Sequence, residues 1–465
     1  MFEPTVRKDP TFHVCRRHNM AIRTKIPLGP FYPIQKDSSL FAMSAGDIFF
    51  QYDELTSMHR EQRNHSFQLV GMFQTITIFM GDIKDSAALY STFLDKEWID
   101  SFEWLYGCFH STGLPIIQKE NLHFLPPDTF YSDLAQLEHK NKNITVGAFC
   151  HENHFLSSLE GALQISQIVN SKMELARNAN RYDIPIPPTL VTTKQRLHSG
   201  EVFSFIDDYG PEVMMKISGL GGSFNVKRIQ SPDEALRHIE EFSEETEVLL
   251  QKQLGSSEYR EMTVDFVITD KECKIDNTRE VLFADGMWVG NHLKRDLSLS
   301  EKQKEILLRC AKWLQSEGYC HPNGFVCGAD FFLGDNDLQV IEINGRWTGG
   351  QTVERAQKKL DVGSEDVYAF MDKLSFNKMK EYQRFVNENL YTIEAKVDTF
   401  KLFPLGIAPH IKHEQENEVS MVWIMVIGDI QAFVTAKEEA LGAKELPTSN
   451  QVAATAQNGH CSQSA

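Results

Sequence analysis

Two runs of alternating apolar and polar residues, separated by a short polar turn, constrain the fold of this chain most strongly. They lie in the segment GFVCGADFFLGDNDLQVIEIN, whose turn is Gly334-Asp335-Asn336-Asp337. Runs this close together pair as an antiparallel β-hairpin. Asp330 lies on the first strand, and Glu342 and Asn344 lie two residues apart on the second. Because side chains alternate between the two faces of a strand, Glu342 and Asn344 point to one face, where they can join Asp330 as three oxygen ligands.

Three oxygens on one face of a sheet suit Mg²⁺. This hard cation takes only a few ligands from protein, because substrate phosphates and waters complete its octahedron. An ordinary half-buried strand with acidic residues facing solvent shows the same alternation, however. Taken alone, the hairpin favours that simpler interpretation.

A glycine-rich loop forms the second notable segment, EVMMKISGLGGSFNVKRI. Lys216 lies at the end of the first strand, and Gly219, Gly221 and Gly222 allow backbone N–H groups to approach an anion closely. A dinucleotide fingerprint is excluded because position 224 is Phe rather than Gly, and a P-loop is excluded because no Gly-Lys-Ser/Thr follows. A protein-kinase loop is excluded because no Asp-Phe-Gly follows. The loop therefore indicates a phosphate site of another kind.

The composition limits the partners of the chain. With 64 acidic and 47 basic residues, its formal charge is −17, which repels nucleic acid and anionic lipid.

The sequence also shows no sign of a zinc site, a disulfide framework or a membrane segment. The eight cysteines form no CxxC pair, so neither a zinc site nor a disulfide framework is predicted. The N-terminus has no apolar signal core, and the most apolar run, residues 419–428, is half the length that a membrane helix needs. We expect a cytoplasmic protein with no nucleic-acid or membrane partner.

The N-terminal part of the sequence alternates predicted strands and helices. Residues 73–82, FQTITIFMGD, predict a strand because they are rich in β-branched residues, and residues 85–109 predict a long helix. Residues 144–150, ITVGAFC, predict another strand. Such alternation is typical of a parallel α/β domain, which we place at residues 1–165.

Local signals also mark the later part of the chain. Ser231-Pro232-Asp233-Glu234 combines a Ser N-cap, Pro at the first helical position and Glu at the third, which predicts the start of a helix. Residues 419–428, VSMVWIMVIG, predict a buried strand. After about residue 441 small polar residues dominate, which predicts a disordered tail over 441–465.

Four segments, taken in their order, resemble the ATP-grasp superfamily over residues 170–351. They are Lys172 on a helix before Ile-Pro-Ile-Pro, Lys216 with its glycine loop, a strand ending in a hinge before Glu261-Met-Thr-Val, and Asp330 with a later Ile-Glu-Ile-Asn-Gly-Arg. A helix lysine or a polar strand connection means little alone. The order of all four, and the specificity of the last, carry the resemblance.

The resemblance implies a role for each matching residue. The residues expected to bind ATP are the phosphate-holding Lys172 and Lys216, the flap residues Gly219, Gly221, Gly222 and Ser223, the adenine-hinge residues Gln251, Lys252 and Leu254, and the ribose-binding Glu261, with Glu258 as the alternative. The residues expected to hold Mg²⁺ or Mn²⁺ are Asp330, Glu342 and Asn344. Arg346 and Lys216 are the expected catalytic residues, with Arg346 steadying an acyl phosphate.

Three positions depart from the pattern of the superfamily. Gln251 replaces a common hinge acid, although its amide oxygen can still accept a hydrogen bond from adenine. Phe224 replaces a small flap residue. Gly328 stands where some amino-acid ligases have an arginine two residues before the metal-binding Asp, so no acceptor-site arginine is expected at that position.

The resemblance implies an α/β protein in which a Rossmann-like (pre-ATP-grasp) domain precedes an ATP-grasp domain of two α+β subdomains. We expect the ATP-grasp domain at 166–375, with a lid subdomain at about 188–255, and a C-terminal α+β extension at 376–440.

The implied activity is ATP-dependent ligation. A small-molecule carboxylate would be activated as an acyl phosphate and coupled to an amine, with release of ADP and phosphate. Ligation to a thiol, a phosphotransferase activity and a non-catalytic nucleotide-binding regulator remain alternatives. The sequence names neither substrate and leaves a homodimer open.

Overall fold

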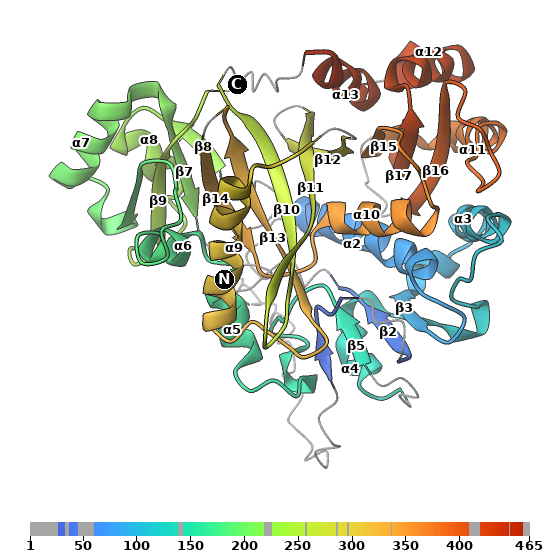
Figure 1. Cartoon of the computed structure of the whole chain (residues 1–465), viewed down its shortest axis with the longest axis horizontal. Helices are drawn as coiled ribbons and strands as arrows, with labels where there is room; N and C mark the ends of the chain where they lie inside the picture. The colour runs from blue at the N-terminus through green and yellow to red at the C-terminus, as the bar shows by residue number, and fades with distance from the viewer. Residues whose placement is uncertain are drawn as a thin grey trace, which may run out of the picture.

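The computed structural model describes residues 27–32, 37–44, 60–137, 143–217, 226–255, 258–284, 287–294, 297–335, 337–408, 419–445 and 447–458. Strands within these ranges form three sheets of five, four and eight strands (Figure 1). Within the same ranges, no helix is both long enough and apolar enough to cross a membrane.

The five-stranded N-terminal sheet is parallel, in the order β1-β5-β2-β3-β4. Its strands are β1 (Leu28–Gly29), β2 (Ser39–Ala42), β3 (Ser86–Tyr90), β4 (Leu122–Leu125) and β5 (Asn143–Val146). The accompanying helices are α2 (Arg60–Met80), α3 (Ile99–Ser111), α4 (Phe130–Leu134) and α5 (Ala162–Val169). A parallel α/β arrangement at the N-terminus is thus confirmed.

Helix α2 corrects the strand expected at residues 73–82. The helix contacts β3 of the N-terminal sheet on one side and β16 (Phe400–Ile407) on another. A helix buried on several sides has no polar face, so its pattern lacks the period that separates helix from strand. The β-branched Thr75 is accommodated because its hydroxyl donates to the carbonyl of Met72 at 2.8 Å.

Strand β3 corrects the single helix expected over residues 85–109, of which α3 forms only the later part. All five residues of β3 are buried. A strand of a parallel sheet is covered on both faces and reads as a short apolar run, which periodicity alone does not separate from helix. Asp85, directly before β3, accepts hydrogen bonds from the backbone N–H groups of Ser39 and Asp82.

The four-stranded sheet, which we call the lid, has its own small apolar core (Figure 1, green). Its antiparallel order is β6-β9-β7-β8. Its elements are β6 (Thr189–Thr193), α7 (Gly200–Tyr209), β7 (Val213–Ile217), β8 (Val226–Ile229), α8 (Pro232–His238) and β9 (Glu247–Lys252). The predicted helix start is confirmed, because the Ser231 hydroxyl accepts from the backbone N–H of Glu234 at 3.2 Å.

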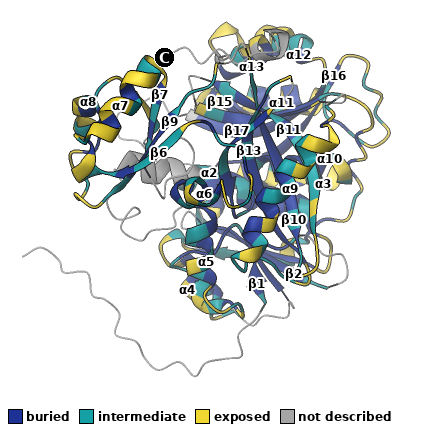
Figure 2. Cartoon of the chain, turned by 60° about the vertical axis from the view of Figure 1, so that its left-hand side comes forward, coloured by how far each residue is buried: buried dark blue, intermediate teal, exposed yellow. Residues whose placement is uncertain are grey.

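The eight-stranded central sheet is antiparallel, in the order β14-β13-β10-β11-β12-β15-β17-β16, and its strands are mostly buried (Figure 2, dark blue). Its strands, besides β16, are β10 (Arg260–Ile268), β11 (Cys273–Ala284), β12 (Met287–Leu293), β13 (Phe325–Leu333), β14 (Leu338–Asn344), β15 (Val367–Ser375) and β17 (Val419–Gly428). The remaining helices are α6 (Lys172–Asn178), α9 (Glu301–Ser316), α10 (Gly349–Lys359), α11 (Met379–Glu388), α12 (Ile430–Leu441) and α13 (Pro447–Asn458). Strands β16 and β17 of the expected C-terminal extension therefore continue the central sheet.

Helix α13 corrects the disordered tail expected from residue 441, and of that stretch residue 446 and residues 459–465 lie outside the described part. Ser449 and Val452 are fully buried. The Ser449 hydroxyl accepts from the ammonium of Lys437 at 3.0 Å, and that ammonium also donates to both oxygens of Asp372, at 2.7 and 2.8 Å. Ser449, one of the small polar residues that suggest disorder in the sequence, thus contacts this buried ion pair directly.

The buried pair generates a stability prediction. Lys437→Met leaves the Asp372 carboxylate buried without its cation, so the free energy of unfolding in urea should fall by about 3–5 kcal/mol. The double variant Lys437→Met, Asp372→Asn removes both charges and should lose clearly less. Equal losses in the two variants would show that the ion pair does not hold α12 and α13 to the sheet.

Candidate active site

The predicted hairpin brings Asp330, Glu342 and Asn344 together on one face of the central sheet. Asp330 of β13 lies directly opposite Glu342 of β14, and Gly328 lies opposite Asn344. The amide Nδ2 of Asn344 donates to Oδ2 of Asp330 at 2.9 Å. The Oδ1 of Asn344 is buried and has no hydrogen-bond partner within the described ranges. A buried amide oxygen without a partner can coordinate a cation or accept a hydrogen bond from a bound ligand.

Two cationic side chains approach the carboxylates from outside the hairpin. Lys172, the first residue of α6, donates from Nζ to Oε1 of Glu342 at 2.6 Å, and its side chain is only 8% exposed. Ser171 positions the start of α6 by accepting from the backbone N–H of Glu174. Arg346, two residues beyond Asn344, donates from Nη1 to Oδ1 of Asn170 at 2.7 Å. The region just before α6 and the region just after β14 therefore meet at the cluster.

The lid contributes the second predicted lysine. Lys216 of β7 donates from Nζ to the Gln251 amide oxygen on β9 at 2.7 Å. Gln251 in turn donates from Nε2 to the Thr189 hydroxyl at 2.9 Å, which fixes the orientation of its amide. The charges of Lys172 and Glu342 both act on Lys216, so the lid lysine lies within electrostatic range of the acidic cluster.

The other predicted hinge residues lie at the end of β9. Lys252 approaches Glu212 with 3.7 Å between Nζ and Oε2, and its backbone N–H donates to the carbonyl of Pro188 at 2.9 Å. Leu254 follows the strand and is half-buried. These residues form the edge of the lid nearest the connection to β10.

Burial shifts the acid–base equilibria of the cluster. It raises the pKa of Asp330 to about 6, together with the negative charge of Glu342. Burial and the charge of Asp330 raise the pKa of Glu261 to about 8. Burial alone would also raise the pKa of Glu342, but the charges of Lys172 and Arg346 bring it below its usual range. Glu342 is therefore the firmly ionised carboxylate of the cluster.

The structure separates the two candidates for a ribose-binding acid. Glu261 lies on β10 and interacts electrostatically with Lys216 and Asp330. Glu258 lies exposed in the turn before β10. Glu261 is thus the acid brought to the cluster, and Glu258 is not.

The glycine loop cannot be placed, because residues 218–225 lie outside the described part of the chain. Gly219, Gly221, Gly222 and Ser223 belong to this stretch, so their expected role stays a prediction.

One contributor to the cluster is missing from the sequence-based prediction. The hydroxyl of Thr263 donates to Oδ1 of Asp330 at 2.6 Å. Thr263 lies two residues after Glu261 on β10, so period-2 alternation places both side chains on the same face. That spacing was the available signal, but it has meaning only once β10 is known to lie beside β13.

The donor set fits a divalent cation that brings further ligands of its own. Within the described ranges, no three His, Cys, Asp or Glu side chains gather in a way that could hold a metal ion. The cluster instead offers two carboxylates and one free amide oxygen. Mg²⁺ or Mn²⁺ takes several of its six ligands from phosphate and water, so this small protein contribution suits an ion bound together with a phosphate.

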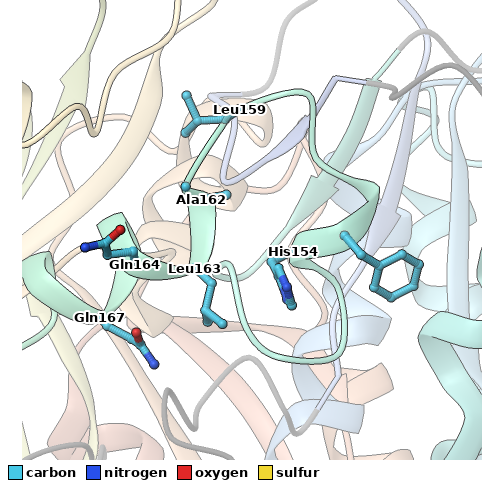
Figure 3. A pocket seen from close by; sticks show the side chains of 8 residues that line it. His154, Leu159, Ala162, Leu163, Gln164 and Gln167 are labelled. Carbon is cyan, nitrogen blue, oxygen red and sulfur yellow. The ribbon is translucent and has the colours of Figure 1, made fainter. Parts of the chain in front are cut away.

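A separate surface cavity of ≈ 350 Å³ lies between α5 and the segment before it, and it shares no residue with the acidic cluster (Figure 3). The residues that line it are His154, Phe155, Leu159, Gly161, Ala162, Leu163, Gln164 and Gln167. Its only ionisable side chain is that of His154, whose Nδ1 lies 3.0 Å from the carbonyl of Cys150. The cavity therefore offers no cluster of charged groups to a substrate.

The ion pair between Lys172 and Glu342 generates a prediction about metal binding. Lys172→Met should tighten the binding of Mn²⁺ to the ligand-free chain by about tenfold, because the ammonium competes with the metal for the same carboxylate. Titration followed by electron paramagnetic resonance measures the free Mn²⁺. Lys304→Met, at an exposed pair with Glu301, is the control and should change nothing. Unchanged affinity in Lys172→Met would remove the metal from this cluster.

Comparison with known proteins gives similarity at the level of structure. No protein-family model matches the chain, and no curated protein sequence matches it. Among solved structures, N5-carboxyaminoimidazole synthase from Aspergillus clavatus, in complex with ADP and 5-aminoimidazole ribonucleotide, is 12% identical with a TM-score of 0.52, and the match covers 87% of this chain and 98% of that one.

Two further solved structures are similar to the same degree. N5-carboxyaminoimidazole synthetase from Staphylococcus aureus, complexed with ADP, is 12% identical with a TM-score of 0.52, covering 90% of this chain and 98% of that one. Phosphoribosylamine–glycine ligase from Thermotoga maritima is 11% identical with a TM-score of 0.51, covering 88% and 96%. Identities this low establish likeness of fold. Together with the parallel N-terminal sheet, the lid and the central antiparallel sheet, they show that the chain shares the overall fold of these solved structures, which is the ATP-grasp fold expected from the sequence.

Proposed function

We propose that this protein is an ATP-dependent, ADP-forming ligase that activates a small-molecule carboxylate as an acyl phosphate and couples it to an amine in the cytoplasm. We also propose the division into an N-terminal domain at 1–165, an ATP-grasp domain at 166–375 with a lid at about 188–255, and a C-terminal extension from 376. The observation that carries the proposal is the meeting of oppositely charged groups from separate units. Asp330 and Glu342 come from the central sheet, Lys216 from the lid and Lys172 from the helix between the N-terminal sheet and the lid.

Separate units with complementary charges suit a nucleotide that binds between them. Phosphate groups need cations, and the divalent ion that accompanies them needs carboxylate oxygens. In this proposal, Lys172 and Lys216 bind the phosphates, and Asp330, Glu342 and Asn344 hold Mg²⁺ or Mn²⁺. The flap over the phosphates is proposed to be the glycine loop with Gly219, Gly221, Gly222 and Ser223.

The hinge at the end of β9 is the proposed adenine site. Backbone groups of Gln251, Lys252 and Leu254 would meet the base, and Glu261 would meet the ribose hydroxyls. The Gln251 amide oxygen already accepts from Lys216, and its remaining lone pair can accept from the adenine amine.

The chemistry follows from the charge that develops during phosphoryl transfer. A carboxylate that attacks ATP builds negative charge on the transferred group, and Mg²⁺ supplies positive charge there when bound. Lys216 and Arg346 add fixed positive charge at the same place, which is worth more in a buried site than in water. Asn170 orients Arg346 through its 2.7 Å hydrogen bond, so less reorganisation is needed during the reaction.

The substrates are proposed to bind where the N-terminal sheet meets the loop after β14. The backbone N–H of Trp347 donates to the carbonyl of Gly147, directly after the end of β5, at 2.9 Å. The carboxyl ends of parallel strands are common ligand sites in α/β sheets. The name phosphoribosylamine–glycine ligase mentions an amine and an amino acid, which supports amide formation as the first choice here.

Glu342→Gln tests the role of the ionised carboxylate. The change keeps the shape of the side chain and removes one negative charge, so Mg²⁺-dependent turnover should fall by about a hundredfold or more while the chain stays folded. Turnover is measured as a function of Mg²⁺ concentration, and folding by the melting temperature. A folded variant with near wild-type turnover would overturn the metal assignment.

The pH dependence of ADP binding tests Lys216. Burial and the positive charge of Lys172 lower the pKa of Lys216 to about 8. Phosphate favours the charged amine, so above this pKa binding must include uptake of a proton, and affinity falls as pH rises. Between pH 7 and pH 9 the dissociation constant for ADP should increase by about tenfold in calorimetry. Lys216→Arg stays charged over this range and should remove most of the dependence.

The proposal as a whole is tested by a screen of amino acids and small carboxylates, alone and paired with amines, for release of phosphate from Mg-ATP. A ligase should give ADP and phosphate only when both substrates are present. A phosphorylated acceptor would indicate a phosphotransferase, dependence on a thiol would indicate the other ligase class, and ADP binding without any product would indicate a regulator.

A further inference from the structure

A buried ion pair between Asp265 and Arg279 lies on the sheet face that carries the acidic cluster. Asp265 of β10 lies opposite Gly328 of β13, and Arg279 of β11 lies opposite Thr263, which donates to Asp330. The side chains of Asp265 and Arg279 are 0% and 1% exposed. The Arg279 guanidinium donates to both carboxylate oxygens of Asp265. The pair is therefore a neighbour of the cluster without being one of its members.

This pair holds one residue of the loop after β14. Nη2 of Arg279 donates to the Thr348 hydroxyl at 2.8 Å, and the same hydroxyl donates to Oδ1 of Asp265 at 2.8 Å. Apart from bonds to Asn277 on β11, every side-chain hydrogen bond that the pair makes to another residue of the described ranges goes to Thr348. The three side chains form a closed triangle in which Thr348 both accepts and donates.

Two glycines allow the loop to lie this close to the sheet. A Cβ added at Gly328 would lie 2.5 Å from Cγ2 of Thr348 and 3.1 Å from Oδ1 of Asp265. A Cβ added at Gly350 would lie 1.9 Å from Nε of Arg279. Contacts of 2.5 and 1.9 Å are shorter than real Cβ atoms make, so any side chain at either position would force the loop and the ion pair apart. The absence of an arginine at position 328 is thus explained by Thr348, which occupies that space.

The loop carries Arg346 between fixed points. Its first end is Asn344, which is bonded to Asp330, and its second end is Thr348, the N-cap residue of α10. Arg346 lies midway and is oriented by Asn170. A shift of Thr348 would therefore move the guanidinium of Arg346 relative to the cluster.

A purely structural role does not account well for the pair. Replacing a buried ion pair by apolar residues of similar volume is often neutral or stabilising, so packing alone gives no reason for charges at this place. A bidentate guanidinium and a carboxylate instead impose direction on the groups that they bind. Here the pair binds the side-chain amide of Asn277 on β11 and, outside the strands, the Thr348 hydroxyl on the loop that carries Arg346.

We propose that Asp265 and Arg279 are positioning residues that fix the loop Gly345–Thr348 through the Thr348 hydroxyl and so hold Arg346 at the reacting phosphate. The role of Arg346 rests on the proposed function, whereas the anchoring of the loop does not. The inference assigns to Thr348 a contribution to turnover that is separate from nucleotide and metal binding.

Three single substitutions on the loop and α10 test this inference. Thr348→Val keeps the shape and removes the hydroxyl, Thr348→Ser keeps the hydroxyl and removes the methyl group, and Thr352→Val is the matched control. The Thr352 hydroxyl is buried in the same helix but donates only to the carbonyl of Gly349, at 2.6 Å. Thr348→Val should lower kcat for phosphate release by about ten- to a hundredfold, with unchanged KM for ATP and unchanged Mn²⁺ affinity. Thr348→Ser and Thr352→Val should stay within about threefold of wild type.

Hydrogen–deuterium exchange of residues 345–351 gives a second readout that needs no substrate. Thr348→Val should exchange faster than wild type in this segment, and Thr348→Ser and Thr352→Val should not. Wild-type exchange in Thr348→Val, or equal losses in the Val and Ser variants at position 348, would overturn the inference. Failure of the wild-type chain to bind ADP would instead count against the proposed function, and the exchange result would still decide whether the pair anchors the loop.

Discussion

Two half-buried carboxylates that face one another on neighbouring strands are the constraint on which the rest of the site depends. Asp330 and Glu342 are directly opposite in the register of β13 and β14. Like charges so placed destabilise a sheet, and burial increases the effect. The chain offsets the repulsion with donors from elsewhere, Thr263 and Asn344 for Asp330 and Lys172 for Glu342. Each donor comes from a different element, so the cluster can exist only when these elements meet.

Helix α10 links the candidate active site to the segments around the N-terminal sheet. Helix α10 begins at the loop that carries Arg346 and ends at Lys359, whose ammonium donates to the carbonyls of Phe79, Gly81 and Pro115. These carbonyls lie at the C-terminal end of α2 and in the segment after α3. A cation that binds the last carbonyls of a helix satisfies groups with no partner inside that helix. The two ends of α10 are therefore held by the loop that carries Arg346 and by backbone carbonyls at the end of α2 and after α3.

The sequence predicted the parts of the structure that local rules determine. The hairpin followed from alternation and its turn, so the meeting of Asp330, Glu342 and Asn344 was predictable. The start of α8 followed from the capping pattern at Ser231. These features depend on residues a few positions apart, where geometry leaves little choice.

The failures share a different cause, which is contact between segments far apart in the sequence. The run that contains Thr75 was predicted as a strand because nothing local shows that α2 is covered by β16. The tail was predicted as disordered because the small residue Ser449 has its meaning only beside Lys437. Thr263 and the pair of Asp265 with Arg279 were missed because their roles depend on which strands lie beside β10.

The most direct test of the central claim is a crystal structure of the protein grown with Mn²⁺ and a non-hydrolysable ATP analogue, with the metal located by anomalous scattering. The account predicts an anomalous peak about 2.0–2.3 Å from oxygens of Asp330, Glu342 and Asn344, with phosphate oxygens completing the coordination. It also predicts that Lys172 leaves Glu342 for a phosphate oxygen. A nucleotide bound elsewhere, or one bound at the cluster with Lys172 still paired to Glu342 and no metal peak, would contradict the account.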